Sequence, residues 1–240
     1  MKTGLHFLFT ALAAALLAGN ACAEAGSVTH LSGTLSVKKA DGSVRILSQQ
    51  SEIASGDTLN TERDTYAQIK FADGGQITLK PNTAIKIENF KFSEQKRQEN
   101  SFVFSLLKGG MRAVTGLIGK IDPDNYLMNI ATGTIGIRGT TYSADDCLSS
   151  DCIVPEAGDP IAPAVYVSVA DGEIVVRNAQ GEQAYRAGQF GQISKGERPL
   201  FLSTDPGLQF TPPATFFQAM GFLTKDGGNP RECVVGGRGR

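Results

Sequence analysis

The feature that most constrains this chain is a short run of alternating apolar and polar residues, repeated along the sequence and closed by tight turns. Tyr66–Phe71 alternates strictly, and Asp73-Gly74 turns it into the next such run, Gln76–Leu79. Asp41-Gly42 and Asp171-Gly172 lie between similar runs and predict two further hairpins, because Asp-Gly suits the turn of a β-hairpin. We therefore expect an all-β fold, either a β-solenoid or a sandwich of short strands, with a short helical C-terminal tail.

Residues 130–142 (IATGTIGIRGTTY) set three glycines at a spacing of three. The G-x-G-x-x-G spacing of a dinucleotide site is absent, and no Gly-Lys-Ser/Thr sequence follows. We predict a strand in which Ile135 and Ile137 enter the core while Gly136 and Arg138 take the other face. An arginine beside an apolar sheet needs an acceptor, so Arg138 either pairs with a carboxylate of the fold, which we favour, or faces a partner.

The N-terminus has the pattern of a secretory signal peptide. Lys2 precedes an apolar run over residues 8–18 and the small-residue triplet Ala21-Cys22-Ala23, so we expect cleavage between Ala23 and Glu24. The alternative makes Cys22 a lipid-bearing residue, but the leucine usual three positions upstream is missing. No later stretch approaches the ~20 apolar residues of a spanning helix. The mature chain is expected in the periplasm or secreted, without a membrane span.

Composition argues against two classes of function. The formal net charge of −1 provides no basic face for nucleic acid. Histidine is the commonest general base near neutral pH, and the chain has only His6, in the signal peptide, and His30, which its neighbours indicate is an ordinary strand residue. We expect no catalytic residue and no cofactor.

A second group of candidate functional side chains lies in the loop over residues 145–163, which carries two cysteines and several acidic residues. The template of neither a zinc site nor a calcium loop fits this order of ligands, so no metal is expected. In an oxidising compartment, Cys147 and Cys152 predict a disulfide that closes a small loop. Cys233 is then left over: it is free, bonds another chain, or displaces one of the pair.

The region after Pro199 has a weaker pattern. After two prolines, four apolar side chains fall on one side of a predicted helix, which we expect to pack on the protein's own sheet: Phe216, Phe217, Met220 and Leu223. The expected organisation is a signal peptide at 1–23, a first β domain at 24–145, a disulfide loop with a β-rich extension at 146–198, and a C-terminal tail at 199–240.

Several motifs over roughly residues 28–145 together resemble the FecR domain. In order, they are Asp41-Gly42, Ser55-Gly56-Asp57-Thr58-Leu59-Asn60-Thr61, Ala67-Gln-Ile-Lys-Phe-Ala-Asp73-Gly74, Leu79-Lys-Pro-Asn-Thr83 and Ile135-Gly-Ile-Arg-Gly-Thr-Thr-Tyr142. The resemblance implies a periplasmic β-rich domain that binds proteins and has no known catalytic residues. In the regulator that names the family, a cytoplasmic arm acts on a sigma factor. This chain has a cleavable signal in place of that arm, so neither sigma-factor control nor iron sensing is expected.

From these observations we expect a non-catalytic exported protein that acts by protein–protein contact in the periplasm or cell envelope, with a part in signalling. The candidate contact residues are Arg138, Thr140, Thr141 and Tyr142, at what we expect to be an exposed strand edge, together with the cysteine loop. The partner is an envelope or periplasmic protein whose identity the sequence does not provide.

Two other classes of function remain as alternatives. The first is binding of an envelope glycan or small ligand, against which the absence of tryptophan argues. The second is an enzyme that uses carboxylates of residues 145–159 for acid–base chemistry.

Overall fold

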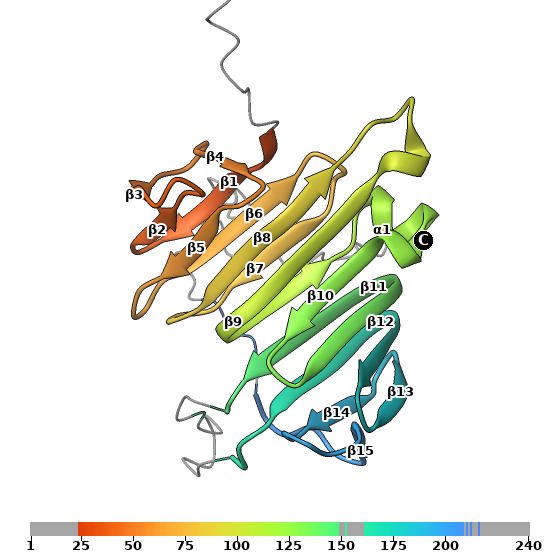
Figure 1. The fold of residues 1–240 in the computed structure, drawn as a ribbon. Coiled ribbons are helices and arrows are strands. Elements are labelled where there is room, and N and C mark those ends of the chain that lie inside the picture. Colours follow the sequence, from red (N-terminus) through yellow and green to blue (C-terminus); the bar gives the residue numbers. More distant parts are fainter. Residues whose placement is uncertain are drawn as a thin grey trace, which may run out of the picture.

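The fold is a single β-sheet. The structure, a computed structural model, describes residues 24–148, 152, 161–208, 210, 212 and 216, and in these residues fifteen strands join into one sheet (Figure 1). The strands are β1 Glu24–Ser32, β2 Leu35–Lys38, β3 Val44–Leu47, β4 Glu52–Ala54, β5 Thr58–Thr61, β6 Tyr66–Phe71, β7 Gln76–Leu79, β8 Ala84–Lys91, β9 Ser101–Val114, β10 Tyr126–Ile130, β11 Gly133–Asp146, β12 Val165–Asn178, β13 Gly181–Arg186, β14 Phe190–Ile193 and β15 Leu200–Leu202. The expected all-β fold is confirmed.

Apart from Phe216, which is helical, the described residues form three short helical segments. The α-helix α1, Leu117–Ile121, and the 3₁₀ turn η2, Pro123–Asn125, connect β9 to β10. The 3₁₀ turn η1, Arg97–Glu99, follows β8 within the charged segment before β9. Among the described residues no helix has the length and apolar character needed to cross a membrane.

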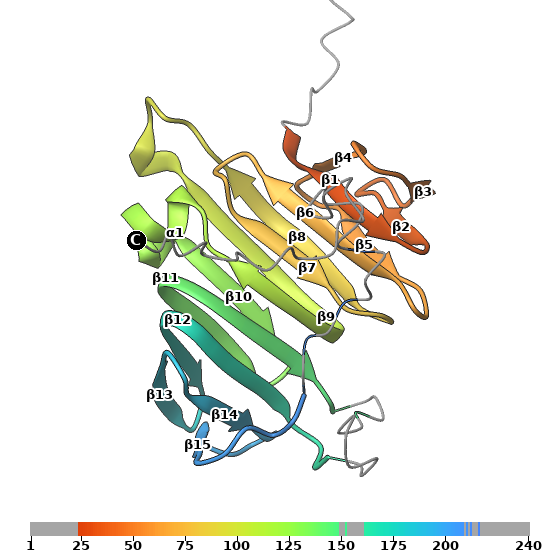
Figure 2. The same ribbon diagram turned by 180° about the vertical axis from the view of Figure 1, so that it is seen from behind.

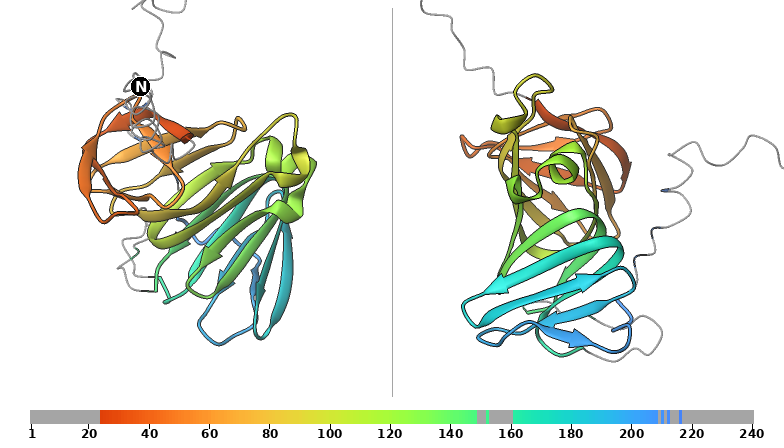
Figure 3. Two further views of the ribbon diagram at one scale, coloured as in Figure 1. Left: turned by 45° about the horizontal axis from the view of Figure 1, so that its top comes forward. Right: turned by 90° about the vertical axis from the view of Figure 1, so that its right-hand side faces the viewer.

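The sheet folds over on itself into two layers. The pairings of the first layer run β3-β2-β5-β8-β9-β10-β11-β12-β13, and those of the second run β4-β1-β6-β7-β9-β11-β12-β14-β15. Three strands therefore belong to both layers. Figure 3 shows the red and orange strands β1–β5 curled over the end of the sheet, and Figure 2 shows the long strands from behind.

Each of the three shared strands, β9, β11 and β12, bends at a glycine with positive φ. These glycines are Gly109 (φ 78°), Gly139 (φ 57°) and Gly172 (φ 78°), a backbone region that side-chain-bearing residues rarely adopt. The hairpin expected at Asp171-Gly172 is therefore wrong. Residues 165–178 form one continuous strand, because both of its halves pair with the two halves of β11 around the bend.

One hydrophobic core lies between the layers. Phe71 of β6, in the second layer, has its ring centroid 4.5 Å from that of Phe102 of β9 and 5.5 Å from that of Phe90 of β8, both in the first layer. Ile135 and Ile137 of β11 are buried in this core, as the alternation predicts. The alternating sequence pattern was consistent with either a solenoid or a sandwich. The structure is better described as a two-layer sandwich.

The signal peptide and most of the tail lie outside the described residues. Residues 1–23 are not among them, so cleavage between Ala23 and Glu24 stays a prediction, and Glu24 begins β1. The predicted tail helix, with Phe217, Met220 and Leu223, and the leftover Cys233 also lie outside the described residues. Phe216 is described and buried, with its ring 6.0 Å from that of Tyr66 on β6.

Candidate functional site

The segment from Arg138 to Tyr142 forms the bend of β11 and is not a sheet edge. β12 pairs with β11 along one side, and β10 and β9 pair with it along the other. At the bend itself, the segment between β9 and α1 replaces a neighbouring strand: Thr115 N donates to Thr140 O at 3.0 Å, and Thr140 N donates to Thr115 Oγ1 at 2.9 Å. The expected strand edge at these residues is therefore corrected.

Two of the four candidate contact residues have buried side chains. Thr140 is 2% exposed, and Tyr142 is 1% exposed with its hydroxyl 3.2 Å from that of Tyr126 across the core. Burial raises the pKa of Tyr142 well above its usual range. Because a partner cannot reach these side chains in this structure, their part is to hold the bend in place. Arg138 and Thr141 face outward from the same strand.

Arg138 belongs to a row of charges that crosses three strands. Arg138 on β11, Glu173 on β12 and Arg186 on β13 lie directly opposite one another. Arg186 Nε donates to Glu173 Oε2 at 2.8 Å, and Arg138 Nη1 lies 3.6 Å from Glu173 Oε1. The favoured pairing of Arg138 with a carboxylate of the fold is confirmed. The hydrogen bond from Arg186, more than the two positive charges, lowers the pKa of Glu173.

The guanidinium groups of this row remain open to solvent. The side chains of Arg138 and Arg186 are 72% and 78% exposed, whereas that of Glu173 is 18% exposed. Two arginines flank one glutamate, so the row presents excess positive charge. Such a row favours an acidic surface on a partner.

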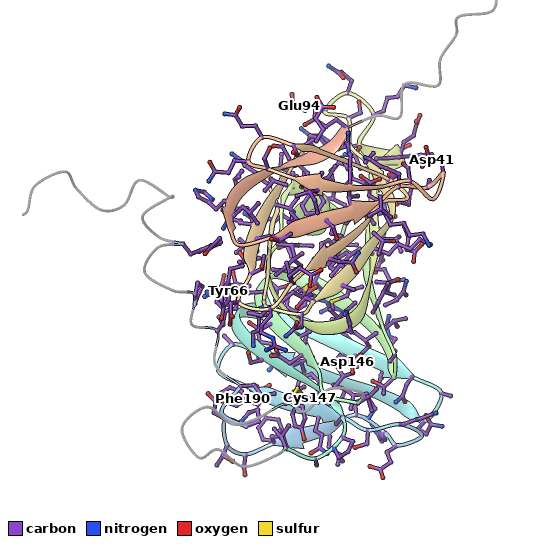
Figure 4. The ribbon with its side chains drawn as sticks, turned by 90° about the vertical axis from the view of Figure 1, so that its left-hand side faces the viewer. Asp41, Tyr66, Glu94, Asp146, Cys147 and Phe190 are labelled. Carbon is purple, nitrogen blue, oxygen red and sulfur yellow. A yellow bond between two sulfur atoms is a disulfide. The ribbon has the colours of Figure 1, made fainter. Side chains whose placement is uncertain are left out.

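The predicted disulfide between Cys147 and Cys152 is confirmed, with Cα atoms 5.3 Å apart. Cys147 lies at the end of β11 in a small apolar cluster with Ala164 and Tyr166, onto which Leu202 and Leu208 pack. The disulfide therefore fixes the loop next to the chain that leaves β15. Figure 4 labels Cys147 beside Asp146 at this end of the molecule.

The true edges of the two layers were not predicted. β3 and β13 end the first layer, and β4 and β15 end the second, each with one strand neighbour in the described part of the chain. On β3, Val44 and Ile46 are each 67% exposed. The alternation of residues 44–47 predicted a strand. Whether a strand lies at an edge depends on pairings between segments that are distant in the sequence.

The described residues contain no arrangement typical of metal chemistry. No group of three or more His, Cys, Asp or Glu side chains able to hold a metal ion occurs among them. His30 is a strand residue of β1, with Nδ1 2.8 Å from Gln68 Oε1 and 3.1 Å from Thr29 Oγ1. Its ring centroid lies 6.1 Å from that of Phe216, so the imidazole is packed within the fold.

Comparisons with known proteins point to one family. The family model FecR, described as "FecR protein", matches residues 57–175. This match crosses the domain boundary expected at residue 145, and the boundaries stay predictions. The comparison with curated proteins finds no match.

Two similar solved structures are those of a candidate anti-sigma factor from Parabacteroides distasonis ATCC 8503. They have TM-scores of 0.47 and 0.46 at 10% and 9% sequence identity. In both cases 62% of this chain and 60% of the other chain are covered, so the chain spans less than two thirds of the length of these structures.

Proposed function

We propose, because this chain belongs to the FecR family over residues 57–175, that it is a non-catalytic exported protein that acts in signalling by holding another protein in the periplasm or cell envelope. Membership of the family supports a signalling or regulatory role. The Cys147–Cys152 disulfide supports an oxidising compartment. The proposed mode of contact is addition of a strand from the partner to the outer side of β3.

The observation that carries this proposal is the free edge of β3. Lys39 N donates to Ser43 O at 2.8 Å where the chain turns from β2 into β3. Because bonded and non-bonded positions alternate in an antiparallel pair, Arg45 and Leu47 bond to β2, and the backbone groups of Val44 and Ile46 point outward. No described strand pairs with that outer side.

The same two residues also expose their side chains. Val44 and Ile46 are each 67% exposed, and on an alternating strand they share one face. An added strand would bond to their backbone groups and pack side chains against theirs. Backbone bonds then supply affinity, and alternate side chains supply specificity.

Arg138 and Thr141 remain proposed contact residues at the other end of the first layer. The exposed guanidinium of Arg138, beside Arg186, would meet an acidic part of the partner. The two surfaces are the first and last regions of one layer, so a single elongated partner would have to extend along it to reach both.

A proline substitution tests the β3 edge directly. Ile46→Pro removes the outward N–H and leaves the bonds between β2 and β3 in place, because proline is tolerated where its nitrogen faces away from the sheet. A photo-crosslinking amino acid placed at Ser43 reports the contact in intact cells of the host. We expect an adduct of defined mass whose yield falls about tenfold or more in Ile46→Pro.

The control carries substitutions at exposed aliphatic residues away from the edge. Leu117 and Ile121 of α1 are 43% and 51% exposed, so the double variant Leu117→Lys, Ile121→Lys should retain the adduct. An adduct that survives Ile46→Pro, or that the control weakens equally, would contradict strand addition at β3. A second probe at Thr141 tests the Arg138 surface in the same cells.

A further inference from the structure

A row of polar side chains crosses the outer face of the second layer. Neighbouring strands place these residues directly opposite one another, in the order His30, Gln68, Thr78, Arg112, Ser143, Ser168 and Phe190. The alternate residues of the same strands point into the core. Figure 4 shows Tyr66 and Phe190 on the same side of the molecule.

Described residues of the segment after β15, among them Asp205 and Phe210, lie against this face and turn the row into a groove. Figure 2 shows from behind where this segment leaves β15. Lys80 Nζ lies 3.5 Å from the carbonyl oxygen of Leu208, and the ring of Phe210 meets that of Tyr66 edge-on at 6.0 Å. One cavity of about 300 Å³ lies against Arg112, Ser143, Ser168 and Asp205. A second cavity of about 170 Å³ continues past Gln68 and Thr78.

Arg112 stands where the two cavities meet, since it lines both of them together with Phe210. Within the described part of the chain its guanidinium forms no ion pair and no hydrogen bond, and the same holds for the hydroxyls of Ser143 and Ser168. The nearby carboxylate of Asp145 is already paired with Lys80 at 2.7 Å. Three donors in register on adjacent strands are therefore open to a ligand.

The set of groups fits one class of ligand. A guanidinium binds a carboxylate with two parallel hydrogen bonds. Strand-borne neighbours have Cβ atoms roughly 5 Å apart, so Ser143 is one such step from Arg112 and Ser168 is two steps, or roughly 10 Å. A sugar ring with its exocyclic carboxylate, together with the long side chain of Arg112, covers this distance. The Asp205 carboxylate can accept hydrogen bonds from ligand hydroxyls, and the Phe210 ring provides an apolar wall. A polyol needs both donors and acceptors, whereas a simple anion needs donors alone.

We propose that this groove, lined by Arg112, Ser143, Ser168, Asp205 and Phe210, binds a small saccharide that carries a carboxylate. Arg112 holds the carboxylate, the two serines and Asp205 hold ring hydroxyls, and Phe210 covers one face of the ring. The volume of the larger cavity is at the lower end of the range for small-molecule sites. This ligand site is separate from the β3 edge, so either can fail without the other.

Calorimetric titration of the exported, purified protein tests the site. The probes are three sugar acids with their neutral counterparts: glucuronate with glucose, galacturonate with galactose, and N-acetylmuramate with N-acetylglucosamine. Acetate is the simple anion. We expect at least one acid to bind about tenfold or more tightly than both its neutral counterpart and acetate.

Variants identify the residues. Arg112→Gln should weaken binding of the preferred acid about tenfold or more, and Arg112→Lys should restore only part of it because a lysine lacks the paired donors. Arg177→Gln, at an exposed arginine on the opposite layer, should change nothing. Equal thermal melting of all variants shows that they are folded. Binding of none of the three acids, equal binding of acetate, or equal loss in Arg177→Gln would overturn the proposal.

Discussion

Asp145 has a raised pKa, whereas Asp41 and Glu173 have lowered ones. It is buried at the end of β11, and Lys80 Nζ lies 2.7 Å from its Oδ1. Burial raises its pKa above the usual value near 3.8, and the positive charge of Lys80 offsets only part of that effect. The exposed Asp41 behaves in the opposite way, because hydrogen bonds from Ser43 lower its pKa.

These directions predict opposite pH effects for two matched substitutions. A raised pKa in the folded chain means that Asp145 contributes stability at pH below about 3.8, and that this contribution is lost as the pH rises through the folded pKa. We expect the free energy of unfolding of wild type, minus that of Asp145→Asn, to be larger near pH 3 than near pH 6. Urea unfolding at both pH values measures the difference.

Asp41→Asn is the control, with the sign reversed. The pKa of Asp41 is lowered in the folded chain. Its contribution to the free energy of unfolding is therefore present at pH above the pKa of the unfolded chain, and it is lost as the pH falls through the folded pKa. An advantage of wild type over Asp145→Asn that grows with pH would contradict the assignment.

At the scale of the element, the bend of β12 depends on a glycine that touches another glycine. Gly172 has φ 78°, and a Cβ atom at this position would overlap the carbonyl oxygen of Gly139 and lie 3.0 Å from that of Arg138. Gly139 has φ 57°, and nothing lies within 4 Å of the Cβ atom that it lacks. The two bends are therefore in contact, but only one of them has no room for a side chain.

Alanine substitutions at Gly139 and Gly172 should distinguish the cost of backbone strain from the cost of steric overlap by an added Cβ atom. Gly139→Ala should lower the free energy of unfolding by about 1–2 kcal/mol, the cost of a left-handed conformation. Gly172→Ala adds a clash with backbone atoms, so we expect a loss of roughly 2 kcal/mol more. The midpoints of urea unfolding measure both. Equal losses in the two variants would show that the bend of β12 can move aside.

These bends also show what the local sequence does not determine. The same Asp-Gly dipeptide makes a turn at Asp73-Gly74, between β6 and β7, and a bend at Asp171-Gly172, inside β12. A glycine with positive φ suits both, and the outcome depends on β11, which bends beside it. Alternation predicted the strands and the faces of Ile135 and Ile137, and cysteine spacing predicted the disulfide. Burial of Thr140 and Tyr142 depends on distant partners, Thr115 and Tyr126, which no local pattern contains.

At the scale of the whole molecule, the two layers should unfold together. β9, β11 and β12 run through both layers, and one core lies between them. Unfolding one layer would therefore break strands of the other and expose the shared core, so we expect a single two-state transition. Far-ultraviolet circular dichroism and tyrosine fluorescence should have the same midpoint in urea. Separate midpoints would show that the layers are independent.

The ends of the first layer are chemically unlike, and this sets a limit on assembly. Its last strand, β13, carries charged residues with exposed side chains, such as Glu182 and Arg186, whereas β3 presents Val44 and Ile46. Charges of this kind discourage an incoming segment. An added strand therefore finds one suitable edge in the first layer, and the two ends of this layer do not fit one another, so copies of the chain do not link head to tail through it. Each copy therefore takes up at most one partner strand at its first layer.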